Sequence, residues 1–150
     1  MTLISDVTDF IAQKRLAIVG ISQKGNKFGN IAFKELRKKD YELFLIHPTA
    51  NEMDDFPCYP NLKSLPQQAD GVLISVHPDK TIDVVKDAAE AGIKKIWMQQ
   101  GAESEKAIKY CEDHGLSVVH GECILMFAEP VAFWHRLHRG IWKLLGKYPK

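Results

Sequence analysis

Residues 15–29 read RLAIVGISQKGNKFG, an apolar run that ends at Gly20 and continues into a loop rich in glycine and polar side chains. A short, uninterrupted apolar run of this kind is typical of a strand that is buried on both faces. The following segment, 27–38, places Phe28 and Leu36 on one helical face and its basic side chains off that face. We therefore predict a strand, a glycine loop and a helix, the first unit of a parallel sheet.

The same alternation of apolar runs and amphipathic segments continues along the chain. Strands are predicted at 15–20, 41–46, 71–76, 93–98 and 116–119, and helices at 27–38, 80–91 and 104–114. Parallel strands joined by crossover helices follow from this order. We expect an α/β fold that is Rossmann-like and doubly wound, with a mainly parallel sheet of about five strands and helices on both faces.

The whole chain, 1–150, is predicted to form a single domain, because its 150 residues are enough for one hydrophobic core. A short N-terminal helix is expected within 2–14, and a C-terminal helix at about 130–146. Between the second and third strands, the segment 51–68 contains three prolines and only a weak helical signal. We treat this segment as irregular.

Composition and charge exclude several classes of function. Hydrophobic residues make up 45% of the chain, and no apolar run reaches the roughly 18 residues that a membrane span requires. A formal net charge of +1 gives no global field that would attract nucleic acid. The three cysteines lack C-x-x-C spacing and the N-terminus is unlike a signal peptide, so we expect free thiols and a cytoplasmic location.

The loop after the first strand is a candidate site for an anion. Glycine lets backbone N–H groups approach a phosphate closely, and the following helix N-terminus adds partial positive charge. The residues predicted to form this cradle are Gly20, Ser22, Lys24, Gly25 and Lys27. The alternative is that the glycines only make a tight turn between strand and helix.

Two familiar nucleotide motifs are absent from this loop. A Walker A loop ends in Gly-Lys-Ser or Gly-Lys-Thr, whereas Gly25 is followed by Asn26, which disfavours NTP hydrolysis. The G-x-G-x-x-G fingerprint is missing because no glycine stands two residues after Gly20. NAD sites also need an acidic residue at the end of the second strand, where this chain has His47 and Pro48.

The remaining strands also end in residues that could contact a ligand. The candidates are His47, Pro48, His77, Pro78, Gln99, Gln100, Gly101 and Cys123. Each proline sets the direction in which the chain leaves the sheet, and each imidazole could hydrogen-bond a ligand or cap a helix. All of these positions are expected at the carboxyl edge of the sheet, where ligands of open α/β folds bind.

Taken in order, these features resemble the CoA-binding protein family, whose Rossmann-like domain is similar to the first domain of the succinyl-CoA synthetase α subunit. The matching segments are the glycine loop 20–25, Pro48, Pro78, the segment 97–101 and the pair 123–124. Coenzyme A is therefore the expected cofactor, and a nucleotide of this kind the expected small-molecule ligand.

The resemblance also implies roles for individual residues. Ser22, Gln23 and Lys24 would meet the CoA phosphates, Pro48 and Pro78 would flank the nucleotide, and the segment 99–101 would face the pantetheine. In one respect the chain departs from the synthetase pattern, because Thr49, Ala50 and Asn51 stand where a lysine would follow the second-strand proline. Lys24 and Lys27 are the available substitutes. The 150 residues are also expected to lack the domain that carries the phosphorylated histidine of the synthetase, so ligase activity is not expected.

Three functional hypotheses remain open. The first is a CoA-binding module without catalytic activity, acting as a carrier, a sensor or a partner of an acyl-CoA enzyme, alone or as a homodimer. The second is a small enzyme, either NAD(P)-dependent or dependent on Cys123 as a thiol near His120. The third is an interaction protein with an unused cleft. His135 and His138 have helical spacing that could share a metal, but no third ligand is evident and none is expected.

Overall fold

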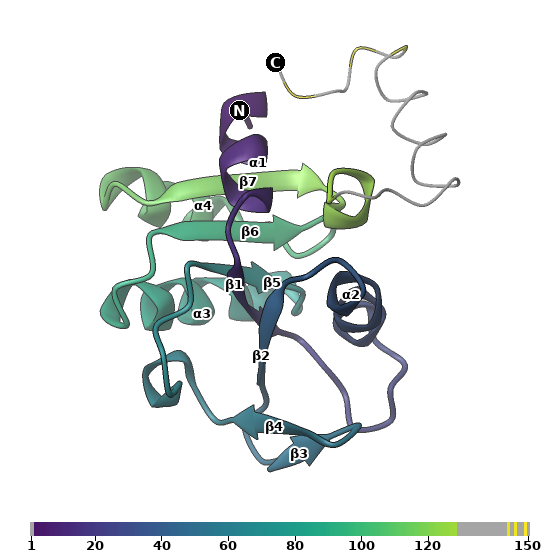
Figure 1. Ribbon diagram of the computed structural model, residues 1–150. Helices are drawn as coiled ribbons and strands as arrows, with labels where there is room; N and C mark the ends of the chain where they lie inside the picture. The colour runs from purple at the N-terminus through teal and green to yellow at the C-terminus, as the bar shows by residue number, and fades with distance from the viewer. Residues whose placement is uncertain (1, 129–143, 145, 147–148, 150) are drawn as a thin grey trace.

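The computed structural model describes residues 2–128, 144, 146 and 149 as an α/β domain (Figure 1). The predicted C-terminal helix at about 130–146 therefore lies outside the residues that can be described. The strands are β1 Arg15–Val19, β2 Glu42–Ile46, β3 Glu52–Met53, β4 Phe56–Tyr59, β5 Gly71–Ile74, β6 Lys95–Gln99 and β7 Ser117–Glu122. The helices are α1 Ile4–Ile11, α2 Phe28–Arg37, α3 Pro78–Glu90 and α4 Glu105–Asp113, with short 3-10 turns η1 Leu62–Ser64 and η2 Ile124–Met126.

These strands form one seven-stranded sheet in the order β3-β4-β2-β1-β5-β6-β7 (Figure 1). Every pairing is parallel except that of β3 with β4. When the parallel strands are numbered along the chain, their order across the sheet is third, second, first, fourth, fifth and sixth. This is the strand order of dinucleotide-binding Rossmann domains, and the direction of winding reverses between β1 and β5. The predicted doubly wound α/β fold is confirmed.

The strand count exceeds the expected five because the segment 51–68 contains a short hairpin. Strands β3 and β4 are joined by Asp54 and Asp55, both in the left-handed region with φ of 48° and 68°. Two successive positive φ angles make the tight turn that suits the twist of a hairpin, and asparagine followed by glycine is its usual signal. An Asp-Asp turn between strands of two and four residues lacks that signal, and Pro57 within β4 argues further against a strand.

Two hydrophobic clusters cover the two faces of the sheet. On one face α1 and α2 pack on β1 through Leu16 and Ile18, and on the other α3 and α4 pack against Ala17 and its neighbours. Successive side chains of a strand point to opposite faces, so a fully apolar strand such as β1 serves both clusters. The predicted helices on both faces are therefore confirmed.

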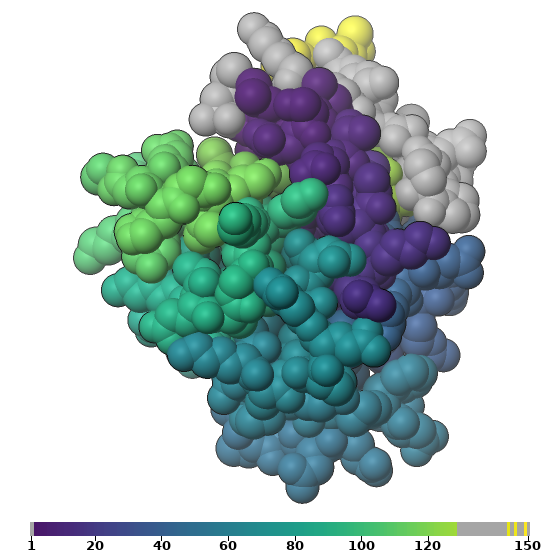
Figure 2. Space-filling model, turned by 60° about the vertical axis from the view of Figure 1, so that its left-hand side comes forward, coloured from purple at the N-terminus to yellow at the C-terminus, as the bar shows by residue number. Residues whose placement is uncertain are grey.

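The N-terminal helix is tied to the far edge of the sheet. Thr2 Oγ1 donates to the carbonyl oxygen of His120 and accepts from its N–H, each at 3.0 Å. Phe10 of α1 packs against the fully buried Trp97 with ring centroids 5.3 Å apart. Figure 2 shows the same proximity at the surface, where the purple N-terminal residues lie beside the green residues of the β7 region. This edge of the sheet is consequently well covered.

Candidate functional site

A cleft of about 510 Å³ lies at the carboxyl ends of β1, β2 and β5, beside α3. Its apolar wall includes Val19, Ile21, Ile46, Pro48, Pro60, Val76 and Val84. Its polar lining consists of Lys27, His47, Lys80, Asp83 and Asp87. The reversal of winding places the cleft here, because the loops after β1 and β5 leave the sheet toward opposite faces and cannot fill the space between them.

Gly20 and Gly29 allow the chain to turn tightly at the head of this cleft. Gly20 has a φ of +116°, and a Cβ added to it would stand 2.1 Å from the carbonyl oxygen of Ser75. A Cβ on Gly29, in the first turn of α2, would stand 2.4 Å from the carbonyl oxygen of Gly20. No side chain can occupy either position without moving backbone. Helix α2 therefore starts immediately against the end of β1.

Asn30 holds the glycine loop in place. The N–H of Ser22 donates to Asn30 Oδ1 and Asn30 Nδ2 donates to the Ser22 carbonyl oxygen, both at 2.9 Å. Within the loop, the N–H of Lys24 donates to Ser22 Oγ at 3.2 Å and the N–H of Gly25 to the Ser22 carbonyl oxygen at 2.9 Å. Asn30 is 3% exposed. Sequence reasoning missed it, although a buried amide needs partners and could have raised the question.

The N-terminus of α2 is left without a cap. Its N-cap residue, Lys27, makes no side-chain hydrogen bond to the helix, and the first turn holds no acidic residue. The N–H of Asn30 donates to the Lys27 carbonyl oxygen at 3.0 Å, whereas the N–H groups of Phe28 and Gly29 have no hydrogen-bond partner among the described residues and remain available beside Lys27. Lys27 lines the cleft as well. Of the predicted cradle, Gly20 and Lys27 line the cleft, whereas Ser22, Gln23, Lys24 and Gly25 form the loop next to it.

His47 and Pro48, which follow β2, both line the cleft. The His47 ring accepts two backbone hydrogen bonds on the same nitrogen: the N–H of Thr49 lies 3.1 Å from Nδ1 and that of Ala50 2.9 Å. The imidazole therefore organises the turn after the strand. No helix follows His47, so the ring does not have the helix-capping role considered from the sequence; it holds a turn and leaves Nε2 for other partners.

His77 and Pro78 stand at the start of α3. His77 is the N-cap residue, and its Nδ1 accepts from the N–H of Asp79 at 3.4 Å. Pro78 occupies the first helical turn, where its missing N–H costs nothing. Neither residue is among those that line the cleft, although Val76 before them and Lys80 after them are.

Helix α3 supplies a wall of the cleft that sequence reasoning did not identify. Lys80, Asp83, Val84 and Asp87 are spaced by three, one and three residues, which places them on one stripe of the helix. That spacing is visible in the sequence, but a helical stripe of charged side chains is typical of a solvated face and does not indicate a binding site. Only the position of α3 beside the strand reversal turns it toward a cleft.

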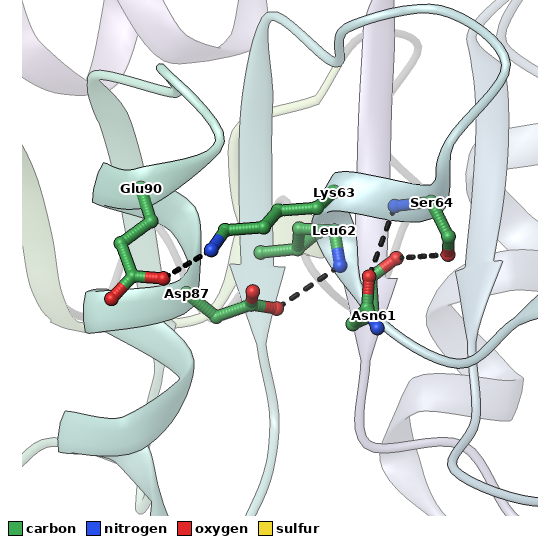
Figure 3. A network of polar contacts seen from close by, with 6 residues as sticks. All are labelled: Asn61, Leu62, Lys63, Ser64, Asp87 and Glu90. Atoms are coloured by element: carbon green, nitrogen blue, oxygen red, sulfur yellow. Dashed lines mark hydrogen bonds and ion pairs between the residues drawn. The ribbon is translucent and has the colours of Figure 1, made fainter.

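A polar network fastens the opposite wall to α3 (Figure 3). Asp87 Oδ2 accepts from the N–H of Leu62 at 3.0 Å, and Lys63 pairs with Glu90. Asn61 caps the short η1 turn by accepting from the N–H of Ser64 at 3.0 Å. The connection from β4 to β5, which includes Pro60 of the cleft, is thereby held against the helix.

The last group of predicted site residues lies at the ends of β6 and β7, outside the lining of the cleft. Gln99 is 4% exposed, and its Oε1 accepts from the N–H of Ile124 at 3.1 Å. Gln100 and Gly101 are exposed, and their N–H groups bond to the Glu122 carbonyl oxygen and to Glu103 Oε2. The half-buried Cys123 follows β7. The structure thus brings these residues together at one point and separates them from Gly20, Lys27 and His47.

Glu122 is the most perturbed carboxyl at this second point. It is 7% exposed, and its buried Oε2 has no hydrogen-bond partner among the described residues. Burial alone raises the pKa of this carboxyl to about 7. The sequence offered no reason to single it out.

The other described groups with shifted pKa values include two cysteines and one histidine. Burial raises the pKa of the Cys111 thiol to about 12, and burial followed by the charge of Glu52 raises that of Cys58. Burial is the main cause that lowers the pKa of His120, and the positive charge of the N-terminus lowers it further. Within residues 2–128, 144, 146 and 149, no group of three or more metal-ligating side chains occurs; His135 and His138 lie outside that range.

An open sheet with reversed winding, and a glycine-lined cleft at the reversal, define the Rossmann-like class of domains, which bind nucleotides at this crevice. The sequence profile of the CoA binding domain matches residues 14–129. This chain therefore belongs to the CoA-binding domain family, and the resemblance inferred from its motifs is confirmed.

Three relatives illustrate the range of the family. The ADP-forming acetate–CoA ligase I of Archaeoglobus fulgidus is 24% identical over 129 residues, which are 79% of this chain but only 19% of the ligase. A hypothetical protein from Pyrococcus horikoshii has a TM-score of 0.78 and 27% identity, covering 85% of this chain and 90% of its own. A conserved hypothetical protein from Pyrococcus furiosus has a TM-score of 0.70 and 37% identity, covering 74% of this chain and 96% of its own. Related domains thus occur both inside ligases and as short chains.

Among the described residues, no helix is long and apolar enough to cross a membrane.

Proposed function

We propose that this chain is a binding module that holds coenzyme A, or a closely similar nucleotide, in the cleft beside α2 and α3 and catalyses no reaction of its own. The observation that carries the proposal is the uncapped N-terminus of α2, which opens onto the cleft with Lys27 at its N-cap. Helix N-termini with free N–H groups attract phosphates, and CoA is rich in them. The cleft volume of about 510 Å³ lies within the usual range of small-molecule sites.

The parts of the ligand are assigned as follows. The glycine loop, including Gly20, Ser22, Gln23, Lys24 and Gly25, and the start of α2 take the phosphates together with Lys27. The apolar wall formed by Ile46, Pro48 and Val84 takes the adenine ring. Pro78, which lies outside the cleft lining at the start of α3, flanks the nucleotide from the other side. The pantetheine arm then follows the carboxyl edge of the sheet toward Gln99, Gln100, Gly101 and Cys123.

The chemistry of the described residues favours binding over catalysis. A thiol enzyme based on Cys123 would need a base beside it, and no hydrogen bond joins the Cys123 thiol to the His120 ring among the described residues. A nicotinamide enzyme would gain from an acidic residue at the end of β2, where His47 stands. The free cysteines suit a cytoplasmic module that delivers its ligand to an acyl-CoA enzyme or to a second copy of the chain.

Thermal unfolding with and without excess CoA, dephospho-CoA, acetyl-CoA, NAD or ATP tests the proposal. A ligand at ~100 times its dissociation constant stabilises a protein by about 2.7 kcal/mol, which raises the midpoint by roughly 5–10 °C for this size. We expect that shift with CoA, and a smaller one for Lys27→Ala and Lys24→Ala. Lys34→Ala, which removes an exposed charge from the same helix outside the cleft, is the matched control.

The outcomes separate the three hypotheses. A shift with NAD alone would favour the reductase alternative over the CoA module. No shift with any nucleotide would remove the cofactor assignment and leave an interaction protein with an unused cleft.

A further inference from the structure

The two backbone hydrogen bonds to His47 fix the protonation pattern of its ring. Nδ1 accepts from the N–H of Ala50 at 2.9 Å and from that of Thr49 at 3.1 Å, so Nδ1 carries no proton. A neutral imidazole has one N–H, which must then be on Nε2. Among the described residues all hydrogen bonds of the ring are made by Nδ1 and none by Nε2, and His47 is one of the residues that line the cleft. The loop after β2 thus presents a fixed donor to whatever occupies the cleft.

This donor stands where the fold places the ribose of a nucleotide. In Rossmann domains that bind NAD, an acidic side chain at the end of the second strand accepts hydrogen bonds from the ribose hydroxyls. An N–H group at the same place has the opposite preference, because it needs an acceptor. Among the acceptors that a ribose can carry, a phosphate group would form the strongest hydrogen bond with this N–H, because hydrogen bonds to charged groups are stronger than those between neutral groups.

His77, the histidine after β5, differs from His47 in the length of its backbone hydrogen bond and in its position relative to the cleft. His77 also accepts a backbone N–H on Nδ1, but the contact is longer, 3.4 Å, and the ring does not line the cleft. The carboxylate of Asp79 lies 3.3 Å from the same nitrogen, so the His77 ring already has an anionic neighbour. The arrangement at His47 is therefore not a general consequence of a histidine before proline.

We propose that His47, through its Nε2–H, recognises a phosphate group on the ribose of the bound nucleotide and so selects ribose-phosphorylated nucleotides over their unphosphorylated counterparts. The inference rests on the proposed function, because it assigns a specificity to the same cleft. The required chemistry is shared by the 3′-phosphate of CoA and the 2′-phosphate of NADP. Lys27 and Lys80, which line the same cleft, supply positive charge for the remaining phosphates.

The test measures dissociation constants by calorimetry for two ligand pairs, CoA with dephospho-CoA and NADP with NAD. For the wild type, dephospho-CoA should bind at least about tenfold more weakly than CoA, the size expected for one hydrogen bond to a charged acceptor. In His47→Asn, the side-chain oxygen can still accept the N–H groups of Thr49 and Ala50, but the Nε2–H is gone. We expect the CoA preference to fall to within about twofold while dephospho-CoA binds as before.

Two further variants sharpen the result. His47→Asp keeps the turn and places an acceptor in the cleft, so it should favour dephospho-CoA over CoA. His114→Asn removes an exposed imidazole at the end of α4 and should leave the ratio unchanged. Imidazole ¹⁵N spectra of the wild type give an independent reading, since the His47 signal should show the Nε2–H form and move with CoA but not with dephospho-CoA.

The possible failures are distinguishable. If neither CoA nor dephospho-CoA binds the wild type, the proposed function itself fails. If both bind with equal affinity, or if His47→Asn retains the full preference for CoA, the cleft holds the nucleotide but His47 does not read its phosphate. A preference for NADP over NAD without any affinity for CoA would keep the role of His47 and change the ligand.

Discussion

The carboxyl edge of the sheet has two halves, and they differ in what surrounds the strand ends. Around β1, β2 and β5 the strands end in a cleft lined by Gly20, Lys27 and His47. Around β6 and β7 they end in packed side chains, with Gln99 bonded to the N–H of Ile124 and Glu122 buried. Both halves carry polar residues after apolar strands. The difference teaches that the reversal of winding, and not the residue types alone, decides where a cleft opens.

Helix α2, which follows β1 in the first half, and helix α4, which follows β6 in the second half, differ in how their N-termini are capped. Helix α4 begins with Ser104, whose Oγ accepts from the N–H of Ala107, and Glu105 adds a negative charge to its first turn. Helix α2 has neither a side-chain cap nor an acidic first turn. In a capped helix, a side chain of the same protein accepts a hydrogen bond from an N–H of the first turn. In an uncapped helix, that N–H is left to donate to a ligand. Helix α2 therefore lacks the stabilisation that a side-chain cap would give, at the place where ligand binding is proposed.

The largest expected effect on stability comes from adding a methyl group at Gly20, which follows β1 in the first half of the edge. Gly20→Ala would place a Cβ 2.1 Å from the Ser75 carbonyl oxygen in a left-handed conformation, so the variant should lose about 3 kcal/mol or more of unfolding free energy. Urea unfolding followed by circular dichroism measures this loss. Gly101→Ala is the control, because its φ of +94° is also left-handed but nothing lies within 4 Å of the added Cβ. Equal losses in the two variants would contradict the close approach at Gly20.

An intermediate effect is expected from Glu122 in the second half. Its pKa is raised by burial from 4.5 to about 7, so the folded state binds the proton more tightly than the unfolded state. The wild type is therefore relatively most stable below pH 4.5 and loses that stability as the pH rises toward 7. Glu122→Gln should be more stable than the wild type by roughly 2–3 kcal/mol at pH 8.5, and by less than about 1 kcal/mol at pH 5.

Urea unfolding at both pH values measures this difference, with Glu112→Gln on the exposed face of α4 as the control. A gain that is the same at pH 5 and 8.5 would rule out titration of Glu122 as its cause. A changed affinity for CoA at constant pH would show that the buried Glu122 carboxyl supports the pantetheine path proposed at the ends of β6 and β7.

The smallest expected effect comes from exchanging the capping properties of the two helices. Lys27→Ser should be about 1 kcal/mol more stable than Lys27→Ala, because serine caps α2, yet it should bind CoA no more tightly. Ser104→Ala should lose about 1 kcal/mol through the lost cap of α4 and leave the CoA affinity unchanged. Denaturant unfolding and calorimetry on the same samples test both statements. Tighter binding by Lys27→Ser than by Lys27→Ala would show that the free N–H groups of α2 do not serve the ligand.

Several parts of the fold and site followed directly from the sequence. The apolar run at 15–19 and the glycine after it predicted the first βα unit, because a strand buried on both faces needs apolar side chains at successive positions. The helices predicted at 80–91 and 104–114 end within one residue of α3 and α4, because Gly92 and Gly115, which follow them, have the positive φ of a helix terminus. The hairpin of β3 and β4 was missed because its Asp-Asp turn gives no usual signal.

The cleft itself was only partly predictable. Gly20, Lys27, His47 and Pro48 were expected in a binding site and do line the cleft, but Lys80, Asp83 and Asp87 were not expected there. The buried clamp of Asn30 on Ser22 was not visible either, because a hydrogen bond between residues eight apart depends on where the loop folds back. The binding roles of Gln99, Gln100, Gly101 and Cys123 stay predictions.

By itself, the sequence determined the periodicities: which segments are strands and helices, which faces they bury, and which residues follow the ends of the strands. These properties are local, since the spacing of apolar side chains and the conformational range of glycine act over a few residues. Only the tertiary structure decided which strand ends open into a cleft and which are packed shut. That outcome depends on the order of the strands across the sheet, and so on contacts between residues that are far apart in the chain.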